Sequence, residues 1–424
     1  MSYKEGDFVE VEKDGATFEG YVIPGDEGYI TLKMTGGGYI AGFLKDQVSV
    51  TVIPEKCRTL TSQTENFFGR NPVRHTEGLK NISVLTLSGP IGCYHDDEID
   101  AEALKHTAED MLAEVPEIGE FANISGRPLF TELSENIGPA RWTEVAKAVY
   151  DEIKAGADGV IVTCGADTMG EIATAVSFML ETPVPVVFSG ALRSPDRPCS
   201  DNHMNMLCAA RAAVSDIAEV MIVMHATLSD DYCYAHRVVR CRKMNASKRN
   251  TFRSVSVSPI AEIEYKKDEI RITAPYTKRG EKQLALTPGL DDRCAVVKFF
   301  PGAKPDILDY FIGAGYKALI LEGIGSGHVS GSWIPMLEKA DREGIPIFVT
   351  SQCIGGRVNC SLDVTGRLMK KAGITECDDM ITETAYVKAM WLMGQGIFGE
   401  DLKKKMLENV RGELTTRHDE KSWF

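Results

Sequence analysis

From residue 81 onward, the chain repeatedly places a short, mainly apolar run next to a segment with helical spacing. The apolar runs lie at 81–87, 159–162, 183–188 and 220–224. Helical spacing is found at 144–155, 170–180 and 202–215. Continuous apolar runs rich in β-branched residues are typical of strands that are buried on both faces. Because strands and helices alternate, the pattern predicts an α/β fold in which right-handed crossovers build parallel sheets covered by helices.

The pattern also divides the chain into parts. Residues 1–55 alternate apolar and polar side chains in short runs between Gly, Pro and Asp turns, which predicts a small antiparallel β-barrel domain. Residues 56–78 are polar and show no periodicity, so we interpret them as a linker. Alternating strands and helices then predict a first lobe at 79–285 and, after a turn-rich break, a second lobe at 286–424.

Composition narrows the class of protein. The 424 residues suffice for two or three domains with buried cores. The net charge of -14 argues against direct contact with a nucleic-acid backbone, so an RNA-related role would leave the polyanion to a partner. No run approaches the roughly 18 apolar residues of a membrane span, and no signal peptide is recognised. The eleven cysteines form no Cys-x-x-Cys pair, and we therefore expect a cytoplasmic protein with free thiols and no membrane contact.

Two of the predicted strands run directly into turns. The strand at 159–162 leads directly into the turn Thr163–Met169, which contains Asp167. The strand at 81–87 is followed by a turn that contains Pro90. Because ligands of open α/β sheets bind outside the carboxyl ends of the strands, each turn is a candidate part of a functional site.

Several separated segments resemble the L-asparaginase family. The turn Thr163–Met169 is similar to that family's His-Gly-Thr-Asp-Thr-Met segment. Further segments are similar to its Gly-Ala-x-Arg-Ser-x-Asp-Arg-Pro loop, its substrate-carboxylate segment, its lysine-bearing segment and its C-terminal motifs; these are Ser189–Pro198, Leu133–Asn136, Arg242–Met244 with Phe252–Ser254, and 350–353, 356–359 and 386–388. With the small β domain in front, the chain most resembles the archaeal D subunits of glutamyl-tRNA(Gln) amidotransferase.

The resemblance implies a fold, an activity and partners. It implies an asparaginase-like fold of two lobes with parallel sheets, a homodimer, and a subunit that releases ammonia from Asn or Gln without a cofactor. The ammonia would pass to a tRNA-binding E subunit, the second partner that the resemblance implies.

The resemblance also implies roles for individual residues. Asp167 and Lys243 would form the catalytic relay, and Asp167 would also bind the α-amino group of the substrate. Ser134 and Glu135 would complete the substrate-binding pocket. Each has a purely structural alternative, because Asp167 and Ser134 could be helix N-caps and Lys243 a surface charge.

The two nucleophile positions differ from the family, which has threonines there. Pro90 and Ala166 occupy these positions, and neither side chain has a hydroxyl. This favours a second interpretation, in which the chain is a non-catalytic paralogue that binds Asn, Gln, Asp or Glu or acts as a scaffold. Thr168 is present in the family as well and is expected to pack rather than to react.

Cys164 stands where the family has a histidine. At a buried strand end it is expected to pack as a small hydrophobe, with a thiol nucleophile as the alternative. Cys93, His95 and Asp96 would offer zinc ligands together with Cys164 if the two turns met. The sequence does not indicate that they meet, and no metal is expected.

Overall fold

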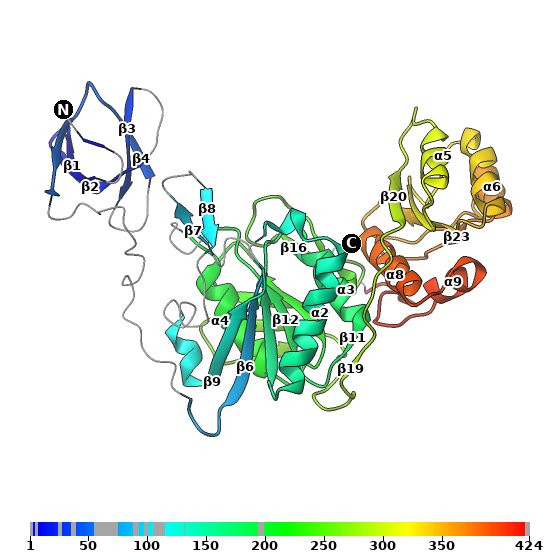
Figure 1. Cartoon of the computed structure of the whole chain (residues 1–424), viewed down its shortest axis with the longest axis horizontal. Helices are drawn as coiled ribbons and strands as arrows, with labels where there is room; N and C mark the ends of the chain where they lie inside the picture. Colours follow the sequence, from blue (N-terminus) through cyan, green and yellow to red (C-terminus); the bar gives the residue numbers. More distant parts are fainter. Residues whose placement is uncertain are drawn as a thin grey trace.

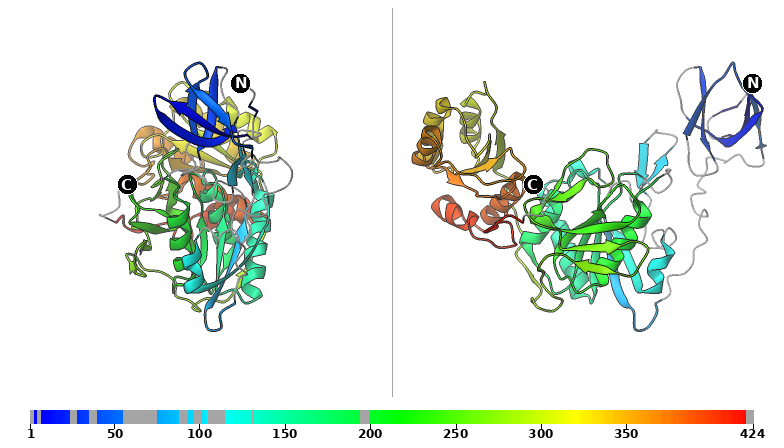
Figure 2. Two further views of the ribbon diagram at one scale, coloured as in Figure 1. Left: turned by 90° about the vertical axis from the view of Figure 1, so that its left-hand side faces the viewer. Right: turned by 180° about the vertical axis from the view of Figure 1, so that it is seen from behind.

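The fold is described from a computed structural model, in which three parts follow one another along the chain (Figure 1). The described residues are 3–4, 7–23, 28–34, 40–54, 75–87, 93–96, 101–104, 115–130, 132–193 and 199–419. Figure 2 shows from behind that the N-terminal sheet and the C-terminal lobe stand at opposite ends, with the first α/β lobe between them. No helix within the described ranges is long and apolar enough to cross a bilayer.

The N-terminal part is an antiparallel sheet of five strands. They are β1 (Phe8–Lys13), β2 (Ala16–Ile23), β3 (Tyr29–Met34), β4 (Ile40–Leu44) and β5 (Ser49–Val52), in the order β4-β3-β2-β1-β5. Asp14 and Gly15 both have positive φ between β1 and β2, as a tight hairpin of two residues requires. Among the described residues no ladder joins β4 to β5, so the antiparallel sheet is established and the closed barrel remains a prediction.

The first α/β lobe contains a mixed sheet of eight strands in the order β18-β17-β14-β13-β12-β10-β6-β9. Its parallel strands are β6 (Lys80–Thr86), β9 (Ala122–Pro128), β10 (Gly159–Thr163), β12 (Val186–Ser189) and β13 (Val220–His225). Its antiparallel strands are β14 (Tyr232–Arg237), β17 (Ala261–Glu264) and β18 (Ile270–Ile272). The predicted parallel arrangement therefore holds for β6, β9, β10, β12 and β13, and the sheet as a whole is mixed rather than parallel. The six residues between β13 and β14 are too few for a parallel crossover, so β14 runs antiparallel to β13.

Helices cover both faces of this sheet. Helices α2 (Pro139–Lys154) and α3 (Met169–Met179) pack on one face, together with Val160 and Val162 of β10. Helix α4 (Asn202–Val214) packs on the other face with Ile161. The alternation along β10 confirms a strand buried on both sides. Helix α2 begins five residues earlier than its spacing indicated, because Pro139 is well suited to the first helical position.

The second lobe is built on a parallel sheet of four strands. These are β20 (Cys294–Lys298), β21 (Ala318–Gly323), β22 (Ile347–Ser351) and β23 (Thr375–Glu376). Its helices are α5 (Asp306–Gly313), α6 (Ile334–Arg342), α7 (Val364–Lys371), α8 (Thr382–Gly394) and α9 (Gly399–Met406). Residues of α8 belong to the same apolar core as α3, so the two lobes share a packed junction.

Short two-stranded ladders complete the described structure. They are β7 (Cys93–Asp96) with β8 (Ala101–Leu104), β11 (Leu180–Glu181) with β19 (Ala285–Leu286), and β15 (Cys241–Lys243) with β16 (Phe252–Ser254). Short 3-10 helices lie at Pro116–Glu120, Ser134–Asn136, Val238–Arg240 and Gly331–Trp333. The boundaries of the domains and of the linker, as read from the sequence, remain predictions.

The end of the described chain returns to the first lobe. We call residues 407–419 the C-terminal strap. Arg411 donates from Nε to the carbonyl of Ser177 at 2.6 Å, and the Asp419 N–H donates to the carbonyl of Ser256 at 3.1 Å. Within the junction, the wholly buried Arg240 donates to the carbonyl oxygens of Asp379 at 2.7 Å and Glu413 at 3.1 Å. The strap thus closes the junction between the lobes.

Candidate functional site

Three neighbouring strands of the first lobe end at one edge of the sheet. The N–H of Leu87, just after β6, donates to the carbonyl of Thr163 at 2.8 Å. The N–H of Cys164 donates to the carbonyl of Ser189 at 3.1 Å. A Cβ on Gly190 would come within 2.5 Å of the Cys164 carbonyl oxygen, so the exits of β10 and β12 lie in close contact. This is the edge at which the sequence places the site.

At this edge the structure brings together two of the predicted site residues, which are 76 positions apart in sequence. The Nζ atom of Lys243, from the β15–β16 hairpin, lies 2.5 Å from Oδ1 of Asp167, in the turn after β10. Lys243 also donates to the carbonyl of Ala246 at 3.3 Å. The Asp167 side chain is 74% exposed and that of Lys243 only 15%, so the carboxylate is the member of the pair that a ligand can reach.

The structural alternative for Asp167 finds no support. The N-cap of α3 is Thr168 rather than Asp167, and no side chain caps the helix. The Thr168 hydroxyl instead donates to the backbone carbonyl of Ser134 at 2.8 Å. Thr168 therefore packs, as expected, and fixes the segment around Ser134 beside the turn.

Ser134 and Glu135 occupy a short 3-10 helix that this hydrogen bond anchors. The residue Ser134 is buried, whereas Glu135 is exposed. The structure thus places the segment next to Asp167. The roles of Ser134 and Glu135 in substrate binding, and those of Asp167 and Lys243 in catalysis, remain predictions.

Two side chains of the turn after β10 point into the apolar core. Ala166 is 6% exposed, and Cys164 is completely buried among residues of α2, α3 and the sheet. Burial raises the pKa of the Cys164 thiol far above its ordinary value. Because the thiolate is the nucleophilic form, this environment supports packing for Cys164 and argues against a thiol nucleophile.

Part of the predicted site lies outside the described residues. Pro90 belongs to the segment 88–92, and residues 194–198 are the Ser-x-Asp-Arg-Pro part of the Gly-Ala-x-Arg-Ser-x-Asp-Arg-Pro motif. The side chains of Cys93, His95 and Asp96 are likewise outside the described structure. Among the side chains that are described, no three His, Cys, Asp or Glu residues are grouped as metal ligands.

Sequence reasoning missed a cluster of charged residues around Arg242, the neighbour of Lys243 in the sequence. Arg242 forms an ion pair with Glu383 of α8 at 2.9 Å, which joins the two lobes beside Lys243. Glu171, one helical turn after Asp167, faces the same cluster. Its pKa is raised, first by burial and then by the nearby charge of Glu383, with Arg242 opposing. The only sequence signal was the position of Arg242 next to Lys243.

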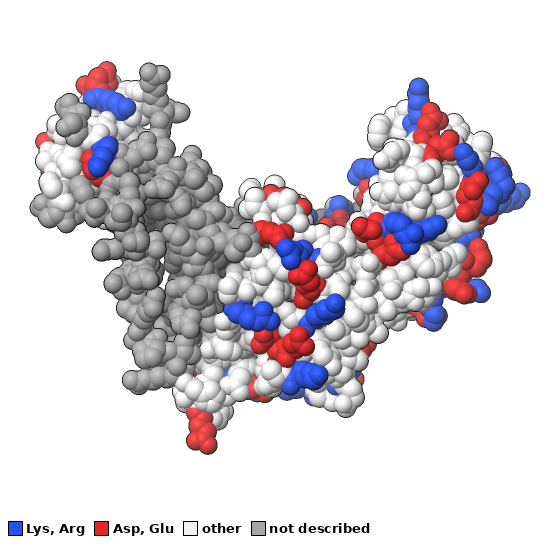
Figure 3. Space-filling view, viewed as in Figure 1, with Lys and Arg blue, Asp and Glu red and all other residues white. Residues whose placement is uncertain are grey.

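One face of the two lobes carries charges of both signs. On the face shown in Figure 3, basic and acidic side chains are interspersed over the first lobe and the C-terminal lobe.

Comparisons with known proteins find relatives along nearly the whole chain. The model of the N-terminal asparaginase domain matches residues 81–277, and that of the glutaminase/asparaginase C-terminal domain matches 293–406. The chain is 47% identical to the D subunit of glutamyl-tRNA(Gln) amidotransferase from Methanosarcina mazei, with 98% of this chain and 99% of the relative covered. It is 40% identical to the D subunit from Archaeoglobus fulgidus, with coverage of 97% and 95%.

Solved structures show the same fold. The thermostable L-asparaginase of Thermococcus kodakarensis has a TM-score of 0.71 at 26% identity, covering 79% of this chain and 99% of that one. L-asparaginase I of Vibrio cholerae has a TM-score of 0.69 at 25% identity, with coverage of 80% and 99%. The motifs, the two lobes and these matches along nearly the whole length show that the chain belongs to the asparaginase family.

Proposed function

We propose that this chain is a D-type amidotransferase subunit that binds an acidic amino acid or its amide at the Asp167–Lys243 pair and assembles with an E-type subunit. The observation that carries the proposal is the retained pair, in which a largely exposed carboxylate lies 2.5 Å from a lysine at the strand exits. An exposed carboxylate suits the ammonium group of an amino acid. Relatives that match along nearly their whole length and carry the name of that subunit support the assembly.

We expect no amide hydrolysis by a threonine nucleophile. An alcohol nucleophile must lie within hydrogen-bond reach of the base that activates it. The turn beside Lys243 offers the methyl group of Ala166 instead, and the Thr168 hydroxyl is engaged with a backbone carbonyl. Pro90 has no hydroxyl either. The chain would therefore bind the amino acid, as a homodimer in complex with its E-type partner, without releasing ammonia.

A second candidate is an amidohydrolase with a rearranged nucleophile. The retained Lys243–Asp167 pair favours it, because a lysine held against a carboxylate is half of the relay that such an enzyme needs. The attacking group would then come from a residue outside the described structure or from the partner subunit.

One pair of measurements separates the candidates. Calorimetric titration with Asp, Glu, Asn and Gln should show binding, and an ammonia assay with Asn and Gln should show no release, with or without the E-type subunit. Ammonia release under either condition would establish the second candidate. Absence of binding by all four amino acids would leave only a scaffold role.

A gain-of-function variant tests the reason for the loss. The double substitution Pro90→Thr with Ala166→Thr restores a hydroxyl at both nucleophile positions, so it should create amide hydrolysis. The same double variant with Asp167→Asn serves as the control and should remain inactive. If the double variant binds the amide but releases no ammonia, the missing hydroxyls are not the cause.

A further inference from the structure

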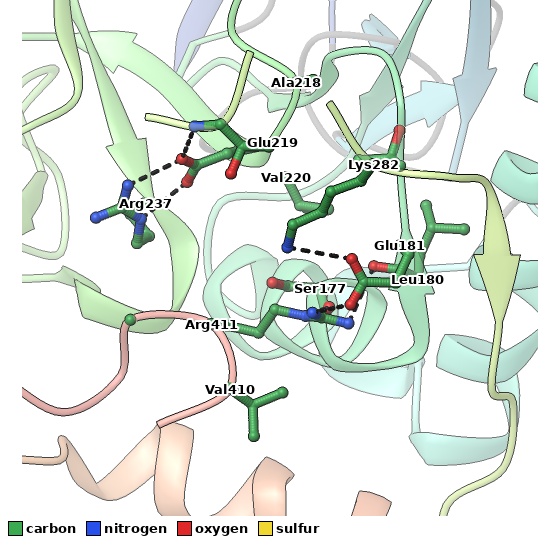
Figure 4. Close-up of a pocket in the computed structure, with 13 residues that line it drawn as sticks. Ser177, Leu180, Glu181, Ala218, Glu219, Val220, Arg237, Lys282, Val410 and Arg411 are labelled. Atoms are coloured by element: carbon green, nitrogen blue, oxygen red, sulfur yellow. Dashed lines mark hydrogen bonds and ion pairs between the residues drawn. The ribbon is translucent and has the colours of Figure 1, made fainter. Parts of the chain in front are cut away.

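A polar pocket lies at the opposite end of α3 from Asp167. Helix α3 begins after Thr168 and has 11 residues, so its two ends are about 16 Å apart. The pocket has a volume of about 270 Å³, and its walls come from the end of α3, the segment before β13, the end of β14, the loop 277–282 and the C-terminal strap. Figure 4 shows two groups of charged side chains on opposite sides of it, Glu219 with Arg237 and Glu181 with Lys282 and Arg411.

On the first side, the guanidinium of Arg237 keeps free donors. Glu219 accepts two hydrogen bonds from Arg237, at 2.8 and 2.9 Å, and a third from the N–H of Thr277 at 2.9 Å. Arg237 uses its Nε and Nη2 atoms for these bonds and for one to the carbonyl of Pro275. Among the described residues no acceptor faces its Nη1 group, which leaves two N–H donors free.

On the second side, Lys282 also keeps free donors. Oε1 of Glu181 accepts from Arg411, and Oε2 lies 3.1 Å from Nζ of Lys282. An ammonium group has three N–H donors, so Lys282 keeps two of them. Its side chain is 40% exposed, and Glu181 is its ion-pair partner in the described structure. Free N–H donors are therefore present on both sides of the pocket, on Arg237 and on Lys282.

The charges point the same way. Arg237, Lys282 and Arg411 carry three positive charges and Glu181 and Glu219 two negative ones, which leaves one positive charge in excess. The carbonyl end of α3 would oppose an anion here. Arg411 offsets that effect, because it donates to the carbonyl oxygen of Ser177 at 2.6 Å.

We propose that this pocket binds a small organic anion whose carboxylate or phosphate oxygens accept from Arg237 and Lys282. Small-molecule sites usually occupy roughly 300–1,000 Å³. The observed volume lies just below that range, which selects a compact anion over a nucleotide. Val410 and Gly412 of the C-terminal strap line the pocket, so the bound anion also holds the strap against the first lobe.

Calorimetric titration of the full chain with malonate and with inorganic phosphate, at constant ionic strength set by chloride, tests the proposal. Saturable binding of malonate alone identifies a carboxylate site, and binding of phosphate alone identifies a phosphate site. Lys282→Met should raise the dissociation constant of the anion by at least about tenfold, since a hydrogen bond to a charged group is lost. If neither anion binds, the pocket is not an anion site.

Two further variants serve as controls for Lys282→Met. Lys278→Met removes an equal charge from an exposed lysine of the same loop that does not line the pocket, and it should leave binding unchanged. Asp167→Asn should also leave it unchanged, because that residue lies at the other end of α3. Equal weakening by Lys278→Met and Lys282→Met would overturn the proposal, as would binding that depends on Asp167 but not on Lys282.

Discussion

Two lysine–carboxylate pairs in this molecule have nearly the same length and opposite surroundings. Lys243 and Asp167 lie 2.5 Å apart, with Asp167 largely exposed. Lys388 and Glu413 lie 2.6 Å apart, and both side chains are completely buried. Lys388 donates in addition to the carbonyl oxygens of Met406, at 2.9 Å, and Glu408. Glu413 also accepts from the N–H groups of the strap.

The difference teaches what each pair can do. All donors of Lys388 have acceptors inside the protein, so no ligand can compete for them. Burial lowers the pKa of Lys388, with Glu413 opposing that shift, and the pair persists because its hydrogen bonds are complete. The carboxylate of Asp167, by contrast, has solvent on most of its surface. Distance alone would not have separated a structural pair from a candidate binding site.

The largest effect on stability is expected for Lys388→Met. It leaves Glu413 buried without its cation, which should cost about 3–5 kcal/mol of unfolding free energy. Urea unfolding measures this, and the double variant Lys388→Met with Glu413→Gln should recover part of the loss. A change below about 1 kcal/mol would mean that the two pairs do not differ in this respect.

The pair Arg242–Glu383 should fall between the two extremes. Its side chains are 32% and 28% exposed, and it joins the lobes beside Lys243. Arg242→Met should lower the unfolding free energy by about 1.5 kcal/mol, the lower end of the range for a hydrogen bond to a charged group. The surface substitution Arg141→Met is a matched control, since its partners Glu132 and Glu144 are partly exposed, and it should cost less.

A smaller effect with a defined pH dependence is expected for Glu181→Gln. Burial by itself would raise the pKa of Glu181, but Arg411 and Lys282 outweigh it and hold the pKa below the usual value of 4.5. The stabilisation is therefore present above that value and is lost as the pH falls through the lower value of the folded state. Urea midpoints of variant and wild type should differ at pH 7 and converge as the pH falls below the folded-state pKa of Glu181. Convergence on raising the pH instead would contradict the assignment.

The smallest effect on stability belongs to Lys243→Met. Because Asp167 is exposed, removing its partner should change the unfolding free energy by less than about 1 kcal/mol. The same substitution should abolish the calorimetric signal for amino-acid binding. A large loss of stability with binding retained would reverse the comparison between the two pairs.

Local patterns predicted most of the first lobe and part of the second. The apolar run at 159–162 predicted β10 as a strand buried on both faces, and its side chains do alternate between the two faces. The direction of β14 was missed, because it depends on the length of the turn after β13 rather than on the strand itself. The proximity of Asp167 and Lys243 came from the family resemblance, since nothing in their local spacing joins residues that far apart.

The buried charges of the junction had no sequence signal at all. Arg240 and Glu413 are 173 positions apart, and isolated charged residues are usually exposed. Only the folded structure shows that the carbonyl of Glu413 accepts from a guanidinium in the other lobe. The pocket beside Arg237 and Lys282 was missed for the same reason, because its walls come from five separate segments.

The position of Arg240 has a consequence for the order in which the protein is made. A ribosome completes the first lobe long before it adds the strap, and until then this guanidinium lacks the carbonyl acceptors of Asp379 and Glu413. Within the first lobe, the same guanidinium donates to the carbonyl of Val255. The junction can therefore close around Arg240 only after the strap has been made.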